Sequence, residues 1–328
     1  MTTATQTRPR LGFVGVGWIG RKRLDAFAES GAAEVSAVFD PAGVDVAGAV
    51  RAGSLGELLE GELDGVAIAT PSALHAQQAI AALERGLPVF CQKPLALTAQ
   101  ETRAVVEAAR RADRLLAVDF CYRELDAARR LEQAVNDGSL GRVFGADLVF
   151  HNAYGPDKEW FYDVDLAGGG CVIDLGIHLV DLALWVLGFP SAADVTARLF
   201  HRGRAIAPEE RVGEDYAVAE LQLEGGTSVR TACSWRLHAG RDCVFEATFY
   251  GTEGAVSVRN VGGSFYDFAA ERLTGTSTEL LSSPPDDWEG RAALRWARGV
   301  AGGGRFDPAA ERLIDVAEVV DRIYGRAT

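Results

Sequence analysis

One short segment restricts the fold of this 328-residue chain more than any other. Gly15-Val16-Gly17-Trp18-Ile19-Gly20 matches G-x-G-x-x-G, and it joins an apolar run at 11–14 to an amphipathic stretch at 19–29. Between a strand and a helix, the first glycine permits a tight turn, the second admits a pyrophosphate to the backbone, and the third lets helix and strand pack closely. The helix N-terminus offers N–H groups to the phosphates. The segment, Trp18 and Ile19 included, therefore predicts a dinucleotide site.

Asp40 extends this prediction to the choice of dinucleotide. It lies twenty residues after Gly20, at the end of a second predicted strand over 35–39. A carboxylate there can accept hydrogen bonds from the adenosine ribose hydroxyls and would repel a 2′-phosphate. The position favours NAD as cofactor and makes NADP the weaker candidate. The alternative is that Asp40-Pro41 only opens a turn.

The first third of the chain alternates strands with helices. Further apolar strands are predicted at 65–69, 88–90 and 115–120, and helices at 73–85 and 99–111. Strands that are apolar throughout are typical of a parallel sheet covered on both faces. We therefore expect an α/β domain with a doubly wound parallel sheet over 10–122, preceded by a disordered leader at 1–9.

The pattern changes after residue 123. Turn signals such as Glu224-Gly225-Gly226 separate long strand-like runs, which predicts an antiparallel meander in a second domain over 123–328. Its predicted helices are 125–135, 172–187, 291–300 and 308–324, and its predicted strands are 143–151, 195–200, 216–223, 227–237, 244–250 and 255–259.

Composition excludes several classes of protein. The net charge of −13 argues against a nucleic-acid partner, which needs a basic face. Five separated cysteines without a C-x-x-C pair predict reduced thiols in a cytoplasm, with no zinc site and no disulfide framework. The polar residues 1–10 do not form a signal peptide. No uninterrupted apolar run approaches the roughly 18 residues of a spanning helix, so we expect no membrane partner.

Two clusters carry candidate catalytic groups. Cys91-Gln92-Lys93-Pro94 follows a strand at the carboxyl edge of the predicted sheet, where ligands bind in such folds. Asp174 and His178 are four residues apart and share one face of a helix, so the imidazole can exchange a proton while the carboxylate helps to hold it. The alternatives are a surface lysine, a core histidine, and metal ligation, for which no third ligand has suitable spacing.

With these motifs the chain resembles the Gfo/Idh/MocA oxidoreductases, the family of glucose–fructose oxidoreductase and inositol dehydrogenase. The likeness runs from about residue 10 to the C-terminal helices. It rests on the glycine motif at 15–20, Thr70-Pro71-Ser72-Ala73-Leu74-His75, Lys93-Pro94, and the G-G-G-x-x-x-D-x-G-x-H pattern at 168–178.

The resemblance implies a Rossmann domain plus an α/β domain with a large, mainly antiparallel open sheet, which in this family often makes oligomer contacts. A homo-oligomer, a dimer or a tetramer, is therefore expected. Carried over by position, Lys93, Asp174 and His178 form the catalytic group. The resemblance further implies that Thr70, Pro71 and His75 line the dinucleotide and that Arg123 lies near nicotinamide and substrate.

The sequence departs from the family pattern at two places. Gln92 replaces the glutamate of Glu-Lys-Pro; it can still accept a hydrogen bond from the nicotinamide ribose but brings no negative charge beside Lys93. Cys121 stands where the family often has Asn, so one polar contact near the nicotinamide is expected to be missing. The role of Lys93, as a proton carrier or as an electrostatic anchor, stays open.

The substrate site is expected mainly in the second domain. Its candidates are aromatic and polar side chains in loop-like stretches, because aromatic faces stack on sugar rings: Tyr154, Lys158, Trp160, Trp235 and His238. The alternative for the two tryptophans is packing in the core.

Together these features predict hydride transfer between NAD and a secondary alcohol or ketone of a sugar, aminosugar, glycoside or cyclitol. Two alternatives remain open. One is a lyase or glycosidase that retains NAD and oxidises its substrate transiently; the other is an NAD-binding sensor without catalysis.

Overall fold

The computed structural model describes residues 8–207 and 210–326 and divides the chain into two compact units. The first comprises the chain up to Cys121 together with Glu289–Ile314, and the second comprises Tyr122–Trp288 together with the chain from Asp315. The division differs from the predicted ranges 10–122 and 123–328, because residues 289–314 return to the first unit. Most of the predicted leader lies outside the described residues, but Pro9 is buried and its carbonyl accepts a hydrogen bond from the Glu34 amide.

The first unit contains a six-stranded parallel sheet in the order β3-β2-β1-β4-β5-β6. This order reverses direction between β1 and β4, as in a doubly wound dinucleotide-binding sheet. The strands are β1 (Arg10–Val14), β2 (Glu34–Phe39), β3 (Val50–Arg51), β4 (Gly65–Ile68), β5 (Val89–Cys91) and β6 (Leu116–Val118).

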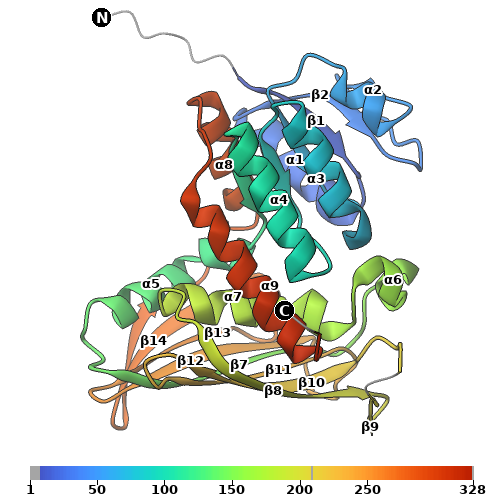
Figure 1. Ribbon diagram of the computed structural model, residues 1–328. Coiled ribbons are helices and arrows are strands. Elements are labelled where there is room, and N and C mark those ends of the chain that lie inside the picture. The colour runs from blue at the N-terminus through green and yellow to red at the C-terminus, as the bar shows by residue number, and fades with distance from the viewer. Residues whose placement is uncertain (1–7, 208–209, 327–328) are drawn as a thin grey trace, which may run out of the picture. The chain divides into compact units, whose positions relative to one another are not determined.

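Helices cover both faces of this sheet (Figure 1). They are α1 (Trp18–Ser30), α2 (Leu55–Leu59), α3 (His75–Glu84), α4 (Ala99–Ala112) and α8 (Arg291–Ala301). Alternate residues of the strands point to opposite faces of the sheet and pack in two separate cores. Val66 and Val89 pack with α2, α3 and α4, whereas Phe13 and Phe90 pack with α1 and α8. The predicted doubly wound α/β domain is therefore confirmed.

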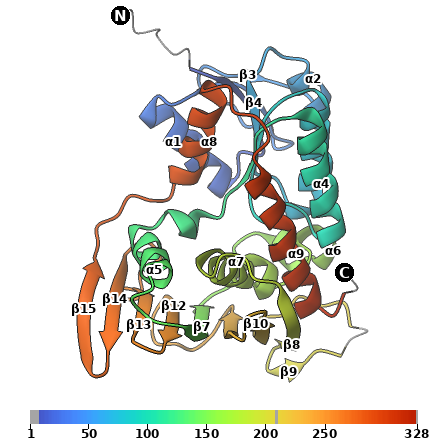
Figure 2. The ribbon, with the colours of Figure 1, turned by 60° about the vertical axis from the view of Figure 1, so that its left-hand side comes forward.

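Helix α8 explains why residues 289–314 leave the second unit. Its buried face consists of Ala292, Ala293, Trp296 and Ala297. The Trp296 ring lies 5.8 Å from the ring of Phe90, and the small alanines let α8 approach α1 closely (Figure 2). No signal within 291–300 identifies the sheet on which this apolar face packs.

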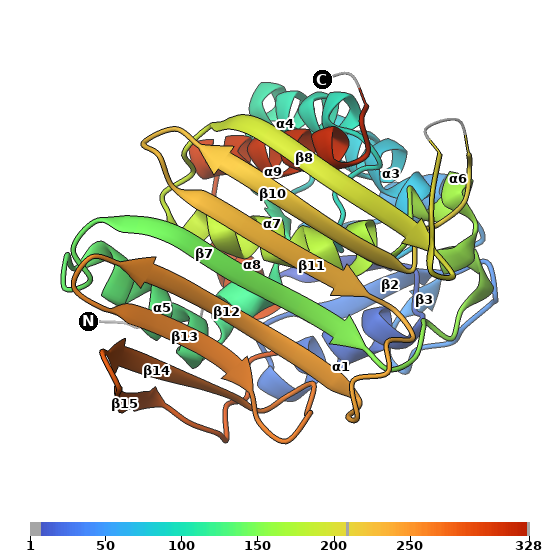
Figure 3. The same ribbon diagram turned by 90° about the horizontal axis from the view of Figure 1, so that it is seen from below.

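The second unit is built on a nine-stranded sheet in the order β15-β14-β13-β12-β7-β11-β10-β8-β9 (Figure 3). Its strands are β7 (Val143–Asn152), β8 (Ala192–His201), β9 (Arg204–Ala205), β10 (Tyr216–Leu223), β11 (Ser228–Ser234), β12 (Cys243–Gly251), β13 (Ala255–Asn260), β14 (Phe268–Thr274) and β15 (Ser277–Ser282). All neighbours pair antiparallel except β7 and β11, which are parallel. The predicted meander is wrong at this point, because β7 lies between β11 and β12.

The helices of this unit are α5 (Asp126–Asn136), α6 (Val164–Ala167), α7 (Ile177–Val186) and most of α9 (Arg312–Ile323). Helices α5 and α7 pack on the sheet face that carries Leu148, Phe245 and Val258. Short 3-10 turns occur at Ser72–Leu74, Cys121–Glu124, Glu159–Tyr162 and Pro308–Glu311, and a π-helical turn at Val172–Gly176 precedes α7.

The segment Val164–Val186 is long and apolar enough to cross a membrane by length and composition, which qualifies the expectation from the sequence. Its mean hydropathy is 1.6, and 89% of its most apolar window is buried inside the structure. A core helix is buried to this extent. Helix α7 forms the second half of the segment and packs against α5 and β7.

Candidate active site

The glycine motif has the geometry that a dinucleotide loop requires. Gly15 has φ +85°, and a Cβ there would lie 2.6 Å from the Ala69 carbonyl oxygen. A Cβ on Gly20 would lie 2.4 Å from the Gly15 carbonyl oxygen, so helix and loop touch. At Gly17 nothing lies within 4 Å, and this residue caps the N-terminus of α1. Gly15 and Gly20 thus shape the loop, and Gly17 leaves open space where a pyrophosphate can approach backbone N–H groups.

Asp40 is bound to the same loop. Its Oδ2 accepts a hydrogen bond of 2.6 Å from the Val16 amide, and its Oδ1 accepts one of 2.8 Å from the Ala42 amide. The turn-forming role considered for Asp40 is therefore present. Each carboxylate oxygen can accept more than one hydrogen bond, so the turn leaves capacity for ribose hydroxyls.

The Thr70–His75 segment follows β4 at the carboxyl edge. The Thr70 hydroxyl donates to Gln78 Oε1 at 2.7 Å. His75 is 1% exposed, and its ring nitrogens lie 2.6 Å and 2.8 Å from the carbonyl oxygens of Pro94 and Thr70. Burial lowers the His75 pKa, an effect partly offset by the two carbonyls. His75 therefore ties the loop after β4 to the Lys93-Pro94 loop after β5.

Gln92 and Lys93 follow β5, beside the end of β6. The Gln92 amide nitrogen donates to Asp119 Oδ2 at 2.5 Å, and Arg23 Nε donates to the same oxygen at 2.5 Å. Burial, with the Asp119 carboxylate, raises the pKa of Cys121 to about 12, so its thiol stays protonated. Sequence reasoning missed Arg23 and Asp119, since neither belongs to a recognised motif.

In the second unit, Asp174 and His178 flank a change of helical geometry. Asp174 lies in the π-helical turn Val172–Gly176, and His178 lies in the first turn of α7. π-Helical turns are rare in proteins, and those that occur are often found at functional sites. The predicted helix over 172–187 is present, but the spacing of four residues does not give the regular α-helical alignment, because a π turn holds an extra residue.

Trp235 fixes the carboxylate of Asp174. Its indole Nε1 donates to Asp174 Oδ2 at 3.0 Å, and Trp235 is 4% exposed. The Tyr162 ring meets it edge to face at 5.6 Å. Trp235, a candidate substrate residue from the sequence, is thus buried and contacts a candidate catalytic residue.

His178 is held by aromatic packing. Its ring lies 4.9 Å from that of Tyr122, in an edge-to-face arrangement, and the residue is 6% exposed. Tyr122 in turn stacks on Phe245 at 5.0 Å and meets Phe150 edge to face. No local sequence pattern indicates this cluster, because its members come from four separated segments.

A further missed residue is Glu214, which caps the π-helical turn Val172–Gly176 that precedes α7. Its carboxylate accepts hydrogen bonds from the amides of Gly170 and Val172 and from the Tyr324 hydroxyl, at 2.8–3.0 Å. Burial raises the Glu214 pKa, although these donors oppose the shift. Only the position of Glu214 before a strand is visible in the sequence, not its reach across 44 residues to Gly170.

Arg123 has a partner inside its own unit. Its guanidinium donates to both carboxylate oxygens of Asp181 on α7, with Nε–Oδ2 at 2.8 Å, and lies over the rings of Trp185 and Phe189. Asp181 is 2% exposed, and burial raises its pKa while Arg123 lowers it. The ion pair anchors Arg123 to the helix that carries His178; a cofactor role for Arg123 stays a prediction.

The other substrate candidates lie on the surface of the second unit. Tyr154 is 51% exposed and near Phe265, Lys158 pairs with Asp157 at 3.1 Å, Trp160 stacks on Phe161 at 3.9 Å, and His238 is exposed. The structure does not gather them into one cluster. Within the described ranges, no three His, Cys, Asp or Glu residues are placed to hold a metal ion.

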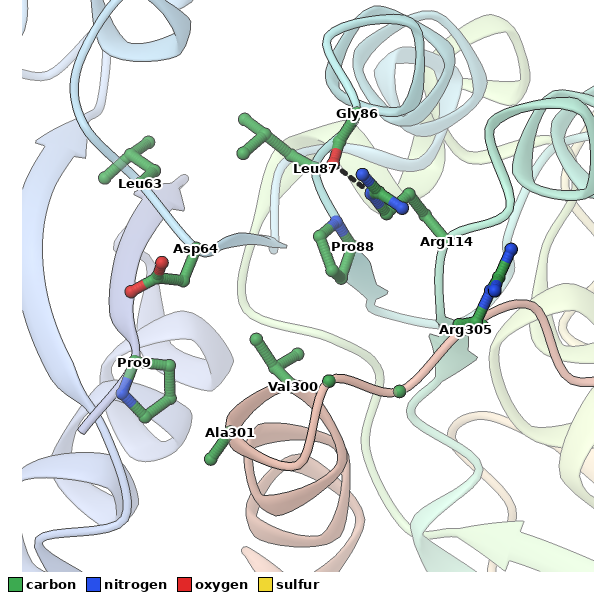
Figure 4. A pocket seen from close by; sticks show the side chains of 12 residues that line it. Pro9, Leu63, Asp64, Gly86, Leu87, Pro88, Arg114, Val300, Ala301 and Arg305 are labelled. Atoms are coloured by element: carbon green, nitrogen blue, oxygen red, sulfur yellow. Dashed lines mark hydrogen bonds between the residues drawn. The ribbon is translucent and has the colours of Figure 1, made fainter. Parts of the chain in front are cut away.

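A cavity of about 360 Å³ lies elsewhere in the first unit (Figure 4). Pro9, Asp64 and Pro88 line it, and these residues directly precede β1, β4 and β5. The cavity is therefore at the amino edge of the parallel sheet, opposite the carboxyl edge where ligands of such sheets bind. It contains none of the candidate site residues.

Two family models match the chain. Residues 9–120 match the oxidoreductase family with an NAD-binding Rossmann fold, and residues 128–257 match the GFO/IDH/MocA C-terminal domain. Together these matches cover well over half of the chain. The chain is 28% identical to D-glucoside 3-dehydrogenase of Escherichia coli over 69% of its own length, and 33% identical to the rhizopine catabolism protein MocA of Rhizobium meliloti over 56%.

These matches span 64% and 58% of the two relatives. Among solved structures, levoglucosan dehydrogenase in complex with NADH superposes with a TM-score of 0.82 at 22% identity, covering 97% of this chain and 96% of the other. At this identity the similarity shows the fold, and it confirms the Rossmann domain plus a large, mainly antiparallel sheet.

Proposed function

The chain belongs to the Gfo/Idh/MocA family of oxidoreductases, and from this premise we propose that it transfers a hydride between NAD and a secondary alcohol, or the matching ketone, of a sugar, aminosugar, glycoside or cyclitol. The NAD-binding Rossmann domain is part of the family description. Curated relatives named as dehydrogenases of a glucoside, of apiose and of inositol support the substrate class.

The observation that carries the proposal is the fixed pair on the catalytic helix. Asp174 is partly buried and held by the Trp235 indole, and His178 is buried and held by the Tyr122 ring. A carboxylate and an imidazole with restrained orientations suit proton transfer to or from a substrate hydroxyl. A histidine placed only for core packing would not require an oriented carboxylate one turn earlier.

NAD, when bound, supplies the hydride acceptor, and the protein supplies position and charge. In the proposed mechanism His178 takes the proton from the substrate hydroxyl, and Asp174 orients the imidazole and stabilises its charged form. Lys93 stabilises the negative charge that develops on the substrate oxygen. Gly15–Gly20, Asp40, Thr70 and Pro71 would hold the dinucleotide, with His75 keeping their loops in place.

The structure changes the expected substrate contacts. Trp235 supports Asp174 and is no longer proposed to stack on a sugar ring, whereas Tyr154 retains the exposed aromatic face that this task needs. Lys158, Trp160 and His238 remain candidates. We further propose that the protein is cytoplasmic and forms a homo-oligomer through the sheet face opposite α5 and α7. Light scattering of the purified protein would test the oligomeric state.

The experiment is a substrate panel followed by absorbance near 340 nm, with NAD and separately NADP, over sugars, aminosugars, glycosides and inositols. We expect NADH to accumulate with a subset of the panel. Product without free NADH would indicate the NAD-retaining lyase or glycosidase, and tight NAD binding without any product would indicate the sensor.

The roles on the catalytic helix are tested by His178→Ala. We expect kcat to fall about 10²- to 10⁴-fold, the usual range for a general acid or base, with the Kd for NAD changed less than about threefold. Equal losses in kcat and NAD affinity would argue against the assignment. The matched control is His201→Ala, since His201 is the last residue of β8 and its Nδ1 bonds the Gly213 carbonyl.

A further inference from the structure

Three buried polar side chains from three segments of the first unit meet at one oxygen atom. Asp119 Oδ2 accepts from Gln92 Nε2 and from Arg23 Nε, each at 2.5 Å. Arg23 is 3% exposed, Gln92 7% and Asp119 1%. They come from α1, from the loop after β5 and from the loop after β6, so the network joins the helix of the glycine motif to the loop that carries Lys93.

Stability alone does not explain this network. Taking an ion pair out of water costs several kcal/mol per ion, and apolar replacements of buried pairs are often neutral or stabilising. Arg23 Nη1 and Asp119 Oδ1 are buried and have no hydrogen-bond partner among the described residues. A buried pair with two unsatisfied atoms is a poor way to stabilise a fold, which favours another purpose.

The network determines which way the Gln92 amide faces. An ionised carboxylate only accepts hydrogen bonds, so the Gln92 nitrogen must point at Asp119 and the Gln92 oxygen must point away. The backbone of both residues is fixed. The backbone N–H of Gln92 donates to the Ile68 carbonyl, and the backbone N–H of Asp119 donates to the Cys91 carbonyl, both at 2.9 Å. Gln92 therefore presents an acceptor oxygen next to Lys93.

We propose that Asp119 and Arg23 are positioning residues that orient Gln92, so that Gln92 Oε1 accepts a hydroxyl hydrogen bond from the nicotinamide half of bound NAD. The inference rests on the NAD binding of the proposed function but not on its substrate. It also accounts for glutamine in place of glutamate at this position. A glutamate would set a second carboxylate against Asp119, whereas glutamine keeps the acceptor and is held by the carboxylate.

The test compares Gln92→Glu, Asp119→Asn and the double variant by their Kd for NAD and for ADP, which lacks both the nicotinamide and its ribose. Each single variant should weaken NAD binding about 10- to 100-fold and ADP binding less than about threefold, a range typical of coupled buried neighbours. The double variant restores one carboxylate and one amide to the pair with their places exchanged, and the amide nitrogen of the introduced asparagine can donate to the introduced glutamate. It should recover NAD affinity to within about threefold of the wild type.

A pH series adds a second readout for Gln92→Glu. The neighbouring Asp119 carboxylate raises the pKa of the introduced glutamate, and in its protonated form that side chain can donate to Asp119 as the amide does. The NAD affinity of this variant should therefore recover as the pH falls, with no such recovery in the wild type. Asp113→Asn is the matched control, because it breaks the Arg305–Asp113 pair elsewhere in the same unit.

Two results would overturn the inference. One is unchanged NAD affinity in both single variants. The other is parallel loss of NAD and ADP binding that the double variant does not restore, which is the behaviour of a purely structural pair. If the wild type binds both ligands but turns over no substrate, the proposed function fails while this inference stands.

Discussion

The indole Nε1 of Trp235 donates a hydrogen bond of 3.0 Å to Oδ2 of Asp174. The donor directly follows β11 and the acceptor lies in the π-helical turn before α7, so the sheet of the second unit holds the Asp174 carboxylate in place. A carboxylate that orients an imidazole needs such support, since its own side chain can otherwise rotate.

Trp235→Phe removes this donor and keeps most of the ring. A hydrogen bond to a charged group contributes about 1.5–3 kcal/mol, so we expect kcat/KM to fall about 10- to 100-fold. The Kd for NAD should not change. Trp185→Phe is the control, as Trp185 contacts the Arg123 guanidinium and not Asp174. An unchanged rate in Trp235→Phe would show that Asp174 needs no support from the indole.

The Glu214 carboxylate predicts a pH dependence of stability. Burial raises its folded-state pKa, so the folded protein binds the Glu214 proton more tightly than the unfolded chain. This contribution to the free energy of unfolding is complete below the unfolded-state pKa of about 4.3 and is lost as the pH rises through the folded-state pKa.

Glu214→Gln should remove that dependence. It should also cost about 1–3 kcal/mol at neutral pH, because an amide cannot accept from Gly170 with both of its polar atoms. Denaturant unfolding of both proteins at several pH values gives the difference curve. A difference that does not vary between about pH 4 and 8 would contradict the role of the buried carboxylate.

Much of the fold follows from local patterns. Predicted strands such as 216–223 coincide with observed ones, because alternation and glycine turns are encoded within the segment. The short elements β3 and α2 and the strands β14 and β15 were not predicted. Their apolar signal is weak, and the six residues of β15 are mostly exposed. Pairing partners also escape local patterns, as the insertion of β7 between β11 and β12 shows.

The candidate site shows the same limit. Gly15 and Gly20 have the tight backbone geometry that the motif predicts, because the positive φ of Gly15 and the close approach of Gly20 to the Gly15 carbonyl belong to the turn itself. Asp119, Glu214 and Tyr122 contact partners that lie tens of residues away in the sequence. Each of the three is also a residue type that is common at many positions. A single sequence carries no signal that selects them.

Asp40→Asn should change cofactor preference. Removing the charge removes repulsion toward a 2′-phosphate, so the ratio of kcat/KM for NADP to that for NAD should rise about tenfold or more. Asn retains one acceptor oxygen, so the bond from the Val16 amide can persist. Asp45→Asn is the control, because Asp45 is an exposed carboxylate that pairs with Arg51. Equal ratios in both variants would reduce Asp40 to its turn-forming role.

Two glycine-to-alanine variants should separate folding from cofactor binding. Gly20→Ala places a Cβ 2.4 Å from the Gly15 carbonyl oxygen, so α1 must move, and we expect a loss of about 1–3 kcal/mol in the free energy of unfolding. Gly17→Ala meets no atom within 4 Å and should leave stability within about 0.5 kcal/mol.

The new methyl group at residue 17 would, however, occupy the space through which a pyrophosphate reaches the N-terminus of α1. The Kd for NAD should therefore rise at least about tenfold in Gly17→Ala, with an unchanged melting temperature. Titration of NAD and thermal unfolding of both variants give the comparison. If Gly17→Ala bound NAD as tightly as the wild type, the dinucleotide would not approach the loop at this glycine.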